Sequence, residues 1–364
     1  MWRCQPWSTS SFQRIDVGPS LAQGRLQVPQ IVKQPPFQDI ADQLMAGVII
    51  PFLGAGASAY DDTIPNDQRP KTAAALAEEI AERAGIAHIH CDNCNHDTLD
   101  LAQLASYYKN CVARRTMLDR LLKRELCKET LRPTRLHRLL AKIAAKKPML
   151  IITTNYDTLI EQAFDEYNEA NGHLIKYDVV ATSADILYYD DDDEESPEFA
   201  GAVRLRREGV GPFTPCSPDD VVPDLSTRSL LYKMHGSVGD GLSWEGGFLI
   251  AEEDYVRFLG RMHRGGVLPS RITSEIKRRQ SCSGGQREPV HSLLFLGYGM
   301  KDWNLRVLLQ ELGIGTGRAG EEKHYAIMRD PDQIEIELLS KRGITAYDWD
   351  LKDFVSRIEP KLSN

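Results

Sequence analysis

The segment Val48–Ser58, with the sequence VIIPFLGAGAS, determines our interpretation of the fold. Its first six residues are mainly apolar and have the length of a buried β-strand, although Pro51 argues against a central place in a sheet. The strand runs directly into two glycines and a serine. Glycine lets the backbone bend tightly and approach a ligand, and amides at the start of a helix can hold a phosphate group. Such a loop can equally be a turn that uses glycine for steric reasons alone.

Short apolar strands alternate with helical patterns along most of the chain. Four helical patterns over 72–146 follow the first strand, and a second apolar strand occupies 149–153. This alternation predicts an α/β fold, a doubly wound Rossmann-like parallel sheet with helical insertions after the first strand. Further strands are predicted at 230–234, 293–296, 324–328 and 344–347.

The domain organisation follows from the same patterns. Residues 1–35 lack periodicity and form an N-terminal arm, flexible or bound to a partner. Residues 36–364 are predicted to form one domain, in which 72–146 is a helical insertion. Residues 172–228, which include the acidic run Asp190–Glu195, are predicted to be an irregular insertion.

The composition is that of a globular protein. The 364 residues are 42% hydrophobic and 26% charged, and no apolar run approaches the length of about 18 residues that a membrane helix needs. The polar N-terminus lacks a secretory signal, so we expect a cytoplasmic protein without membrane contact. The formal net charge of −8 does not favour binding to nucleic acid, and the basic segments 204–207 and 277–279 are interpreted as solvated surface.

The chain has seven cysteines, an odd number, and they are widely scattered, which is not typical of a disulfide framework. His88, His90, Cys91, Cys94 and His96 lie close together, with a spacing that resembles a zinc site. Because no second Cys-x-x-Cys pair completes a four-cysteine site, we predict no metal and interpret the cluster as a polar loop, although metal binding there stays open.

Polar or small residues follow each predicted strand. The second strand leads into Thr154–Asp157, the third into His235–Gly236, and the fourth into Gly297–Gly299 and then Asp302, whereas Asp348 follows the last. In an open α/β sheet, ligands bind at the carboxyl ends of the strands. One binding crevice therefore accounts for all of these segments together.

Two of these residues have the chemistry of a catalyst. His235 titrates near neutral pH and is the natural general base of such a crevice. The amide of Asn155 can donate and accept hydrogen bonds, so it can orient a water molecule or a sugar hydroxyl. Asp157 is a natural N-cap for the helix that follows it.

These motifs, in this order, resemble those of the sirtuin superfamily. That family has a G-A-G-x-S loop, a T-x-N-x-D loop, an H-G pair and a G-[TY]-S-type loop, which are similar to the segments that begin at Gly54, Thr154, His235 and Gly297. The resemblance spans about 37–350, and it implies an NAD-binding fold of the Rossmann type.

The chain departs from sirtuin deacylases in two ways. Only Ile64-Pro65 and Arg69 are similar to the deacylase G-I-P-D-F-R segment, and no paired Cys-x-x-Cys motifs follow His235. The Thr154–Asp157 loop looks like that of a bacterial sirtuin-like branch whose members resemble NAD-consuming effectors of antiphage defence. Some of these assemble with a HerA-type ATPase and others carry a fused sensor, which we do not expect here.

The resemblance implies an NAD+ hydrolase that releases nicotinamide and ADP-ribose, with NAD+ as its substrate and without a metal. Asn155 and His235 would act at the nicotinamide ribose, and Asp157 would hold the Asn155 loop with a secondary role near that ribose. We expect a homo-oligomer, with a HerA-type ATPase as a candidate partner. The residues implied in binding are Gly54, Ala55, Gly56, Ser58, Thr154, Gly297, Tyr298, Asp302 and Asp348.

Three other functions stay open at this point. A protein deacylase would use the same NAD+ chemistry, and an ADP-ribosyl cyclase or transferase would use the same bond cleavage with another nucleophile. A subunit that binds the nucleotide only for assembly would need neither Asn155 nor His235.

Overall fold

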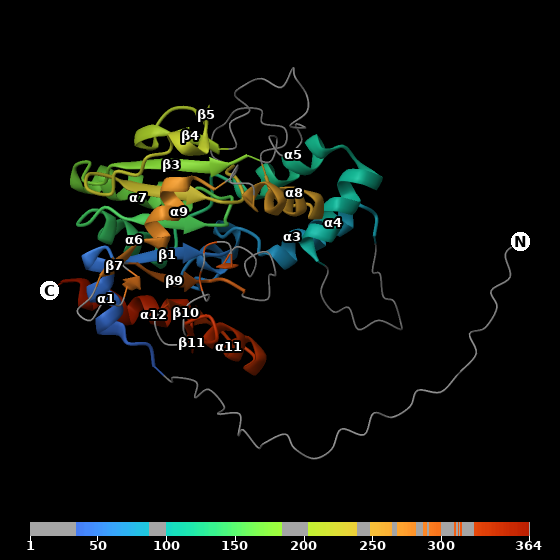
Figure 1. Cartoon of the computed structure of the whole chain (residues 1–364). Helices are drawn as coiled ribbons and strands as arrows, with labels where there is room; N and C mark the ends of the chain where they lie inside the picture. Colours follow the sequence, from blue (N-terminus) through green and yellow to red (C-terminus); the bar gives the residue numbers. More distant parts are fainter. Residues whose placement is uncertain are drawn as a thin grey trace, which may run out of the picture. The chain divides into compact units, whose positions relative to one another are not determined.

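The computed structural model describes residues 34–86, 100–183, 203–238, 248–263, 268–281, 287–289, 291–299, 309–310, 312, 314 and 324–363. Residues 31–364 form one compact unit (Figure 1). The acidic run Asp190–Glu195, the His88–His96 cluster, Asp302 and residues 1–33 of the predicted arm lie outside the described residues.

A mostly parallel sheet forms the centre of the fold. Its strand order is β11-β10-β9-β1-β2-β6-β3-β4-β5. All neighbours from β11 to β3 pair in parallel, whereas β4 and β5 are added antiparallel at one edge. The α/β prediction is therefore confirmed. The strands of this sheet are β1 (Ile49–Leu53), β2 (Leu150–Thr153), β3 (Tyr177–Thr182), β4 (Val203–Arg206), β5 (Thr214–Cys216), β6 (Ser229–Lys233), β9 (Ser292–Leu296), β10 (His324–Met328) and β11 (Ile344–Asp348).

The order of the strands reverses at β1. From β1 the chain adds β2 and β3 on one side and later returns to place β6 between them, whereas β9, β10 and β11 follow on the other side of β1. The carboxyl ends of β1 and β9 therefore border the switch point at which open α/β sheets bind ligands. A separate hairpin consists of β7 (Arg279–Ser281) and β8 (Arg287–Pro289).

Helices cover both faces of the sheet. On one face, α1 (Phe37–Ala46), α6 (Arg135–Ala144), α7 (Leu159–Asn171) and α12 (Leu351–Ile358) contribute to a single apolar cluster with the strands. On the other face, α8 (Glu252–His263), α9 (Ser270–Lys277) and α11 (Gln333–Ser340) complete a second cluster. The buried apolar residues of the central parallel strands belong to one cluster or the other, which explains why these strands are nearly continuous apolar runs. The short helices are α2 (Gly56–Ala59), η1 (Asn66–Gln68), η4 (Arg207–Gly209), η5 (Pro218–Asp220) and η6 (Glu359–Ser363).

A helical lobe lies beyond one end of the sheet (Figure 1). It contains α3 (Ala73–Arg83), α4 (Leu101–Tyr107), the π-helix η2 (Tyr108–Val112) and α5 (Arg115–Leu126). Its own core also includes Phe248 and Ile250 from the segment before α8. The four helices predicted over 72–146 are present, but α6 packs against the sheet with α1 and α7 rather than in this lobe.

The central place of β1 corrects the expectation drawn from Pro51. Strand β1 lies between β2 and β9, so it is not at an edge. Its pairing with β2 begins only at Phe52, whereas Pro51 is paired with Leu294 of β9. A proline lacks the amide hydrogen of a ladder bond, and this position requires none on the β2 side.

The prediction of irregular structure over 172–228 is wrong for the described part. Strand β3 is buried along its whole length, and β4 and β5 extend the main sheet from it. Within β4, Arg206 is buried rather than solvated. Its guanidinium lies 4.8 Å from the centre of the Phe213 ring and 3.5 Å from Glu161, so an aromatic ring and a carboxylate compensate its charge.

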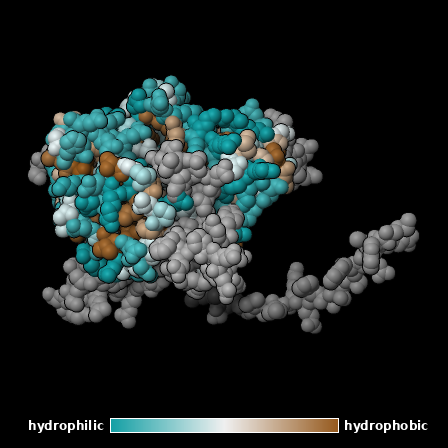
Figure 2. Space-filling model, turned by 90° about the horizontal axis from the view of Figure 1, so that it is seen from above, coloured by the Kyte–Doolittle hydropathy of each residue, from teal (hydrophilic) through white to brown (hydrophobic). Residues whose placement is uncertain are grey.

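The surface matches the composition. Figure 2 shows one face on which hydrophilic residues dominate and hydrophobic ones form small separate groups. In the described part of the chain, no helix combines the length and the apolar character that a membrane crossing requires.

Candidate functional site

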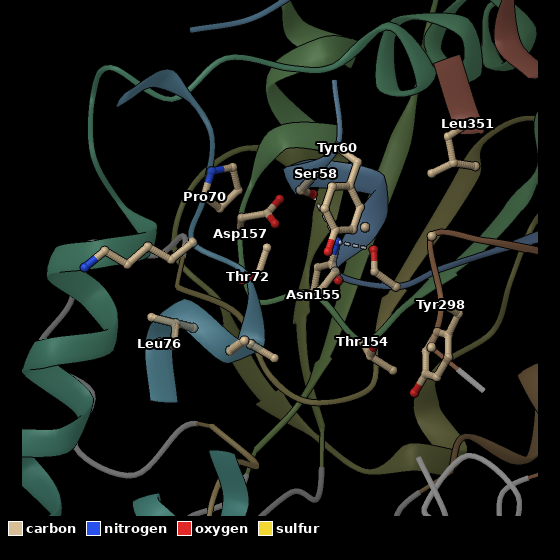
Figure 3. A pocket seen from close by; sticks show the side chains of 18 of the residues that line it. Ser58, Tyr60, Pro70, Thr72, Leu76, Thr154, Asn155, Asp157, Tyr298 and Leu351 are labelled. Atoms are coloured by element: carbon tan, nitrogen blue, oxygen red, sulfur yellow. Dashed lines mark hydrogen bonds between the residues drawn. The ribbon is translucent and has the colours of Figure 1, made fainter. Parts of the chain in front are cut away.

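A cavity of about 530 Å³ opens at the carboxyl ends of the central strands. Its volume lies within the range of sites for small molecules and cofactors. In the view of Figure 3, Asn155 lies between Tyr298 on one side and Thr72 and Leu76 of the helical lobe on the other. Of the predicted site residues, the cavity is lined by Gly54, Ala55, Gly56, Ser58, Thr154, Asn155, Asp157, His235, Gly297 and Tyr298.

The two glycine loops lie against each other at the switch point. The Gly56 N–H donates to the Gly297 carbonyl over 2.8 Å. A Cβ atom on Gly297 would lie 2.2 Å from the backbone nitrogen of Ala57, and one on Gly54 would lie 2.6 Å from the Gly297 oxygen. These glycines are therefore required for the contact between the loops. Ala55 is an exposed residue of this loop and lines the cavity, and its N–H has no partner among the described residues.

The side chain of Asn155 is fixed by two acceptors. Its Nδ2 donates to the Gly54 carbonyl and to Ser58 Oγ, both over 3.0 Å. The Asn155 backbone N–H donates to Thr153 Oγ1 over 3.0 Å. Asn155 is 9% exposed and faces the cavity, and its Oδ1 has no partner within the described structure. The arrangement presents an oriented amide oxygen to a ligand.

Asp157 shapes the loop after β2 and also lines the cavity. The N-cap of α7 is Thr158 rather than the predicted Asp157, but Asp157 Oδ1 accepts the Leu159 N–H over 3.1 Å and supports the start of the helix. The Asp157 carbonyl accepts a hydrogen bond from Nζ of Lys233, which is fully buried at the end of β6. The same Nζ lies 3.0 Å from Glu161 Oε1, so the loop after β2 is held by a lysine that also forms a buried ion pair with α7.

His235 lies at the end of β6 in an apolar and aromatic environment. Its ring centre is 5.3 Å from that of Tyr255 and 6.4 Å from that of Tyr156. Burial lowers the pKa of His235 from 6.5 to about 4, because desolvation disfavours the charged ring. At neutral pH the side chain is therefore an uncharged imidazole that lines the cavity and can accept a proton.

Sequence reasoning missed the wall that the helical lobe contributes. Pro70, Leu76, Leu101 and Leu126 supply apolar surface there. Lys71 also lines the cavity, but its Nζ lies 2.9 Å from Glu79 and 3.3 Å from Glu125, so its charge is compensated within the lobe. No short motif marks these residues, because they become neighbours of the strand ends only through the packing of α3, α4 and α5.

The third wall comes from the ends of β10 and β11. The predicted residue Asp348 is not among the residues that line the cavity. Its exposed carboxylate accepts the Asp330 N–H over 3.0 Å and links the ends of the two strands. Trp349 and Asp350 face the cavity instead. Arg329 is also present, with its guanidinium 4.8 Å from the centre of the Tyr60 ring.

Comparison with known proteins now identifies the family. A family model for the SIR2-like domain matches residues 149–347, slightly more than half of the chain. The chain belongs to the SIR2-like family. The matched region of this SIR2-like protein contains Asn155, Asp157, His235 and Gly297, whereas the Gly54–Ser58 loop precedes it. A search of curated proteins finds no match.

SIR2-like domains use NAD+, and the cavity of this SIR2-like protein has a volume of about 530 Å³, within the range of cofactor sites. The unpartnered Ala55 N–H and the Asn155 amide oxygen offer a donor and an acceptor at the switch point. Among the described residues, no group of three or more histidine, cysteine or acidic side chains is arranged to hold a metal ion. The His88–His96 cluster lies outside these described residues.

Proposed function

We propose that the chain is an NAD+ hydrolase that produces nicotinamide and ADP-ribose. The observation that carries this proposal is the position of Asn155 and His235 in one cavity at the switch point of the sheet. Asn155 presents a fixed amide oxygen and His235 an uncharged imidazole, which are the groups that orient and deprotonate a water molecule.

In the proposed step, the bond between C1′ of the ribose and the nicotinamide nitrogen breaks, and nicotinamide leaves neutral with the bonding electron pair. Water forms a new bond to C1′, and its proton goes to His235. Asn155 orients the water or the ribose hydroxyls. The products are nicotinamide, ADP-ribose and a proton, so atoms and charges balance.

The low pKa of His235 suits this chemistry. Water that attacks an oxocarbenium-like carbon becomes strongly acidic as the bond forms, so a weak base is sufficient to accept its proton. An uncharged imidazole also avoids repulsion with the positive charge on the bound nicotinamide ring. A pKa of about 4 keeps His235 in that form throughout the neutral range.

We further propose that the protein is an effector of antiphage defence that acts in the cytoplasm as a homo-oligomer, with a HerA-type ATPase as its partner. This part rests on the resemblance of the strand-end motifs to the bacterial sirtuin-like branch. Hydrolysis of NAD+ at full rate would deplete the host, so a standing restraint is expected, and assembly is the form of restraint that we favour.

The deciding experiment is to incubate the purified protein with NAD+, alone and with candidate ATPase partners, and to identify the products by mass spectrometry. We expect nicotinamide and ADP-ribose in equal amounts. A cyclic or protein-linked ADP-ribose would assign a different nucleophile, and NAD+ that stays intact in every assembly would contradict an enzymatic role. The variant His235→Ala serves as the inactive control.

A further inference from the structure

The N-terminus of α6 contacts the glycine loop at the base of the cavity. Thr134 Oγ1 donates to the Ala57 carbonyl over 2.9 Å, and His137 Nε2 lies 3.4 Å from Ser58 Oγ. His137 is 1% exposed and is not among the residues that line the cavity. Its imidazole therefore reaches the site only through Ser58.

The backbone fixes which nitrogen of His137 carries the proton. The Thr134 N–H points at His137 Nδ1 over 3.0 Å, and a backbone N–H can only donate, so Nδ1 has a lone pair there. Burial lowers the pKa of His137 to about 3, so the ring carries one proton at neutral pH. That proton is on Nε2, which faces Ser58 Oγ.

The orientation of the Asn155 amide also shows that Ser58 Oγ acts as a hydrogen-bond acceptor. The Gly54 carbonyl can only accept, so the Nδ2 group of Asn155 must face it. The second hydrogen of this Nδ2 then points to Ser58 Oγ. Ser58 thus accepts from Asn155 and from His137, which occupies both acceptor positions of its oxygen. Its own hydroxyl proton is left for the cavity, which Ser58 lines.

We propose that His137 is a positioning residue that holds the Ser58 hydroxyl as a hydrogen-bond donor toward an oxygen of the NAD+ diphosphate. This inference rests on the proposed use of NAD+ at this site. With the opposite tautomer, Ser58 would donate to His137 and the cavity would lose the donor. Ser58 and His137 are about 80 residues apart in the chain, so neither segment alone shows that His137 orients the Ser58 hydroxyl.

The test measures the affinity for ADP-ribose by calorimetry, which requires no catalysis. We expect about 10- to 100-fold weaker binding for both variants, because Ser58→Ala removes the donor to a charged oxygen and His137→Phe removes the group that orients this donor. The double variant should bind no more weakly than Ser58→Ala alone. His137→Gln, whose amide can accept from Thr134 and donate to Ser58, should recover much of the affinity.

His324→Phe is the matched control. His324 is also buried and accepts a backbone N–H, that of Leu293, on Nδ1 over 3.0 Å, but it lies at the other end of its strand. Its replacement should leave the affinity for ADP-ribose unchanged. Nitrogen NMR of histidine-labelled wild-type protein gives a second readout that needs no folded variant, and it should show the proton of His137 on Nε2.

Several results would overturn the proposal. They are a proton on Nδ1 of His137, an unchanged affinity in His137→Phe, or losses that multiply in the double variant. A wild-type protein that binds ADP-ribose but leaves NAD+ intact would refute the hydrolase function while the binding data still decide the role of His137. A wild-type protein that binds no ADP-ribose would refute both.

Discussion

Replacing Gly297 by alanine tests the contact between the two glycine loops. Gly297 has a φ of +67°, and a Cβ atom there would lie 2.2 Å from the nitrogen of Ala57 and 2.6 Å from the carbonyl carbon of Gly56. Both are backbone atoms, so no side chain can move aside. A left-handed conformation costs a non-glycine residue about 1–2 kcal/mol, and overpacking adds about 1–3 kcal/mol. Gly297→Ala should therefore lower the free energy of unfolding by about 2–5 kcal/mol.

Gly85 provides the matched control. Its φ of +68° is nearly identical, but a Cβ atom there meets nothing within 4 Å. Gly85→Ala should thus show only the backbone cost of about 1–2 kcal/mol. The assay is urea unfolding followed by circular dichroism, and the difference between the two variants isolates the steric contribution. Equal losses of free energy in both variants would refute the close approach of the loops, and so would a stable Gly297→Ala protein.

The other predictions concern the chemistry and the assembly. His235→Ala and Asn155→Ala should each lower the rate of NAD+ cleavage by about 10²–10⁴ with an unchanged unfolding midpoint, and near-normal turnover would remove either residue from the mechanism. Because His235 must be unprotonated and its pKa is about 4, kcat/KM should stay level from pH 7 to 5 and fall only near pH 4, whereas an inflection near 6.5 would contradict the desolvation of the ring. Cys91→Ser with Cys94→Ser should leave fold and activity intact, and loss of a bound zinc together with folding would reverse this expectation. Light scattering should give a mass well above 40.9 kDa, and deletion of residues 1–35 should lower the mass and the activity together, whereas a fully active monomer would exclude control by assembly.

The buried histidines should make the protein less stable as the pH falls below 6.5. The pKa values of His137 and His235 lie at about 3 and 4 in the folded protein, below the ordinary value of 6.5. Below pH 6.5 the unfolded chain therefore binds protons that the folded chain excludes, so the free energy of unfolding falls as the pH falls toward 4. Urea midpoints measured from pH 7.5 to 4.5 test this, and the slope should be smaller in His137→Phe. An unchanged slope in that variant would contradict the burial of the ring.

The fold was predictable where a strand is a continuous apolar run. The segments that became β1, β2, β6, β9, β10 and β11 have this property, because parallel strands are buried on both faces. Strand β3 was missed because it lies beside an acidic and proline-containing region. Strand β4 was missed because arginines alternate in it, and only the structure shows that Glu161 and Phe213 compensate Arg206.

The strand-end motifs predicted most of the candidate site, because parallel strands bring their carboxyl ends to one edge. Asp348 lies outside the cavity lining, because the last strand includes it and its carboxylate accepts a hydrogen bond from Asp330. His137 could not be found from spacing, because a histidine within an apolar helix is indistinguishable from a core residue until its partners Thr134 and Ser58 are known.

Because β1 pairs with both β2 and β9, its pairing during translation is completed only after β9 has been synthesised. Gly54 and Gly56 need carbonyls of Leu296 and Gly297, about 240 residues further along the chain. At a translation rate of about 5–20 residues per second, roughly 12–50 seconds separate the emergence of the two partners. A nascent chain that ends before Ser292 therefore exposes one unpaired edge of β1 and lacks one wall of the cavity. The nascent chain therefore lacks the complete cavity until β9 has emerged from the ribosome.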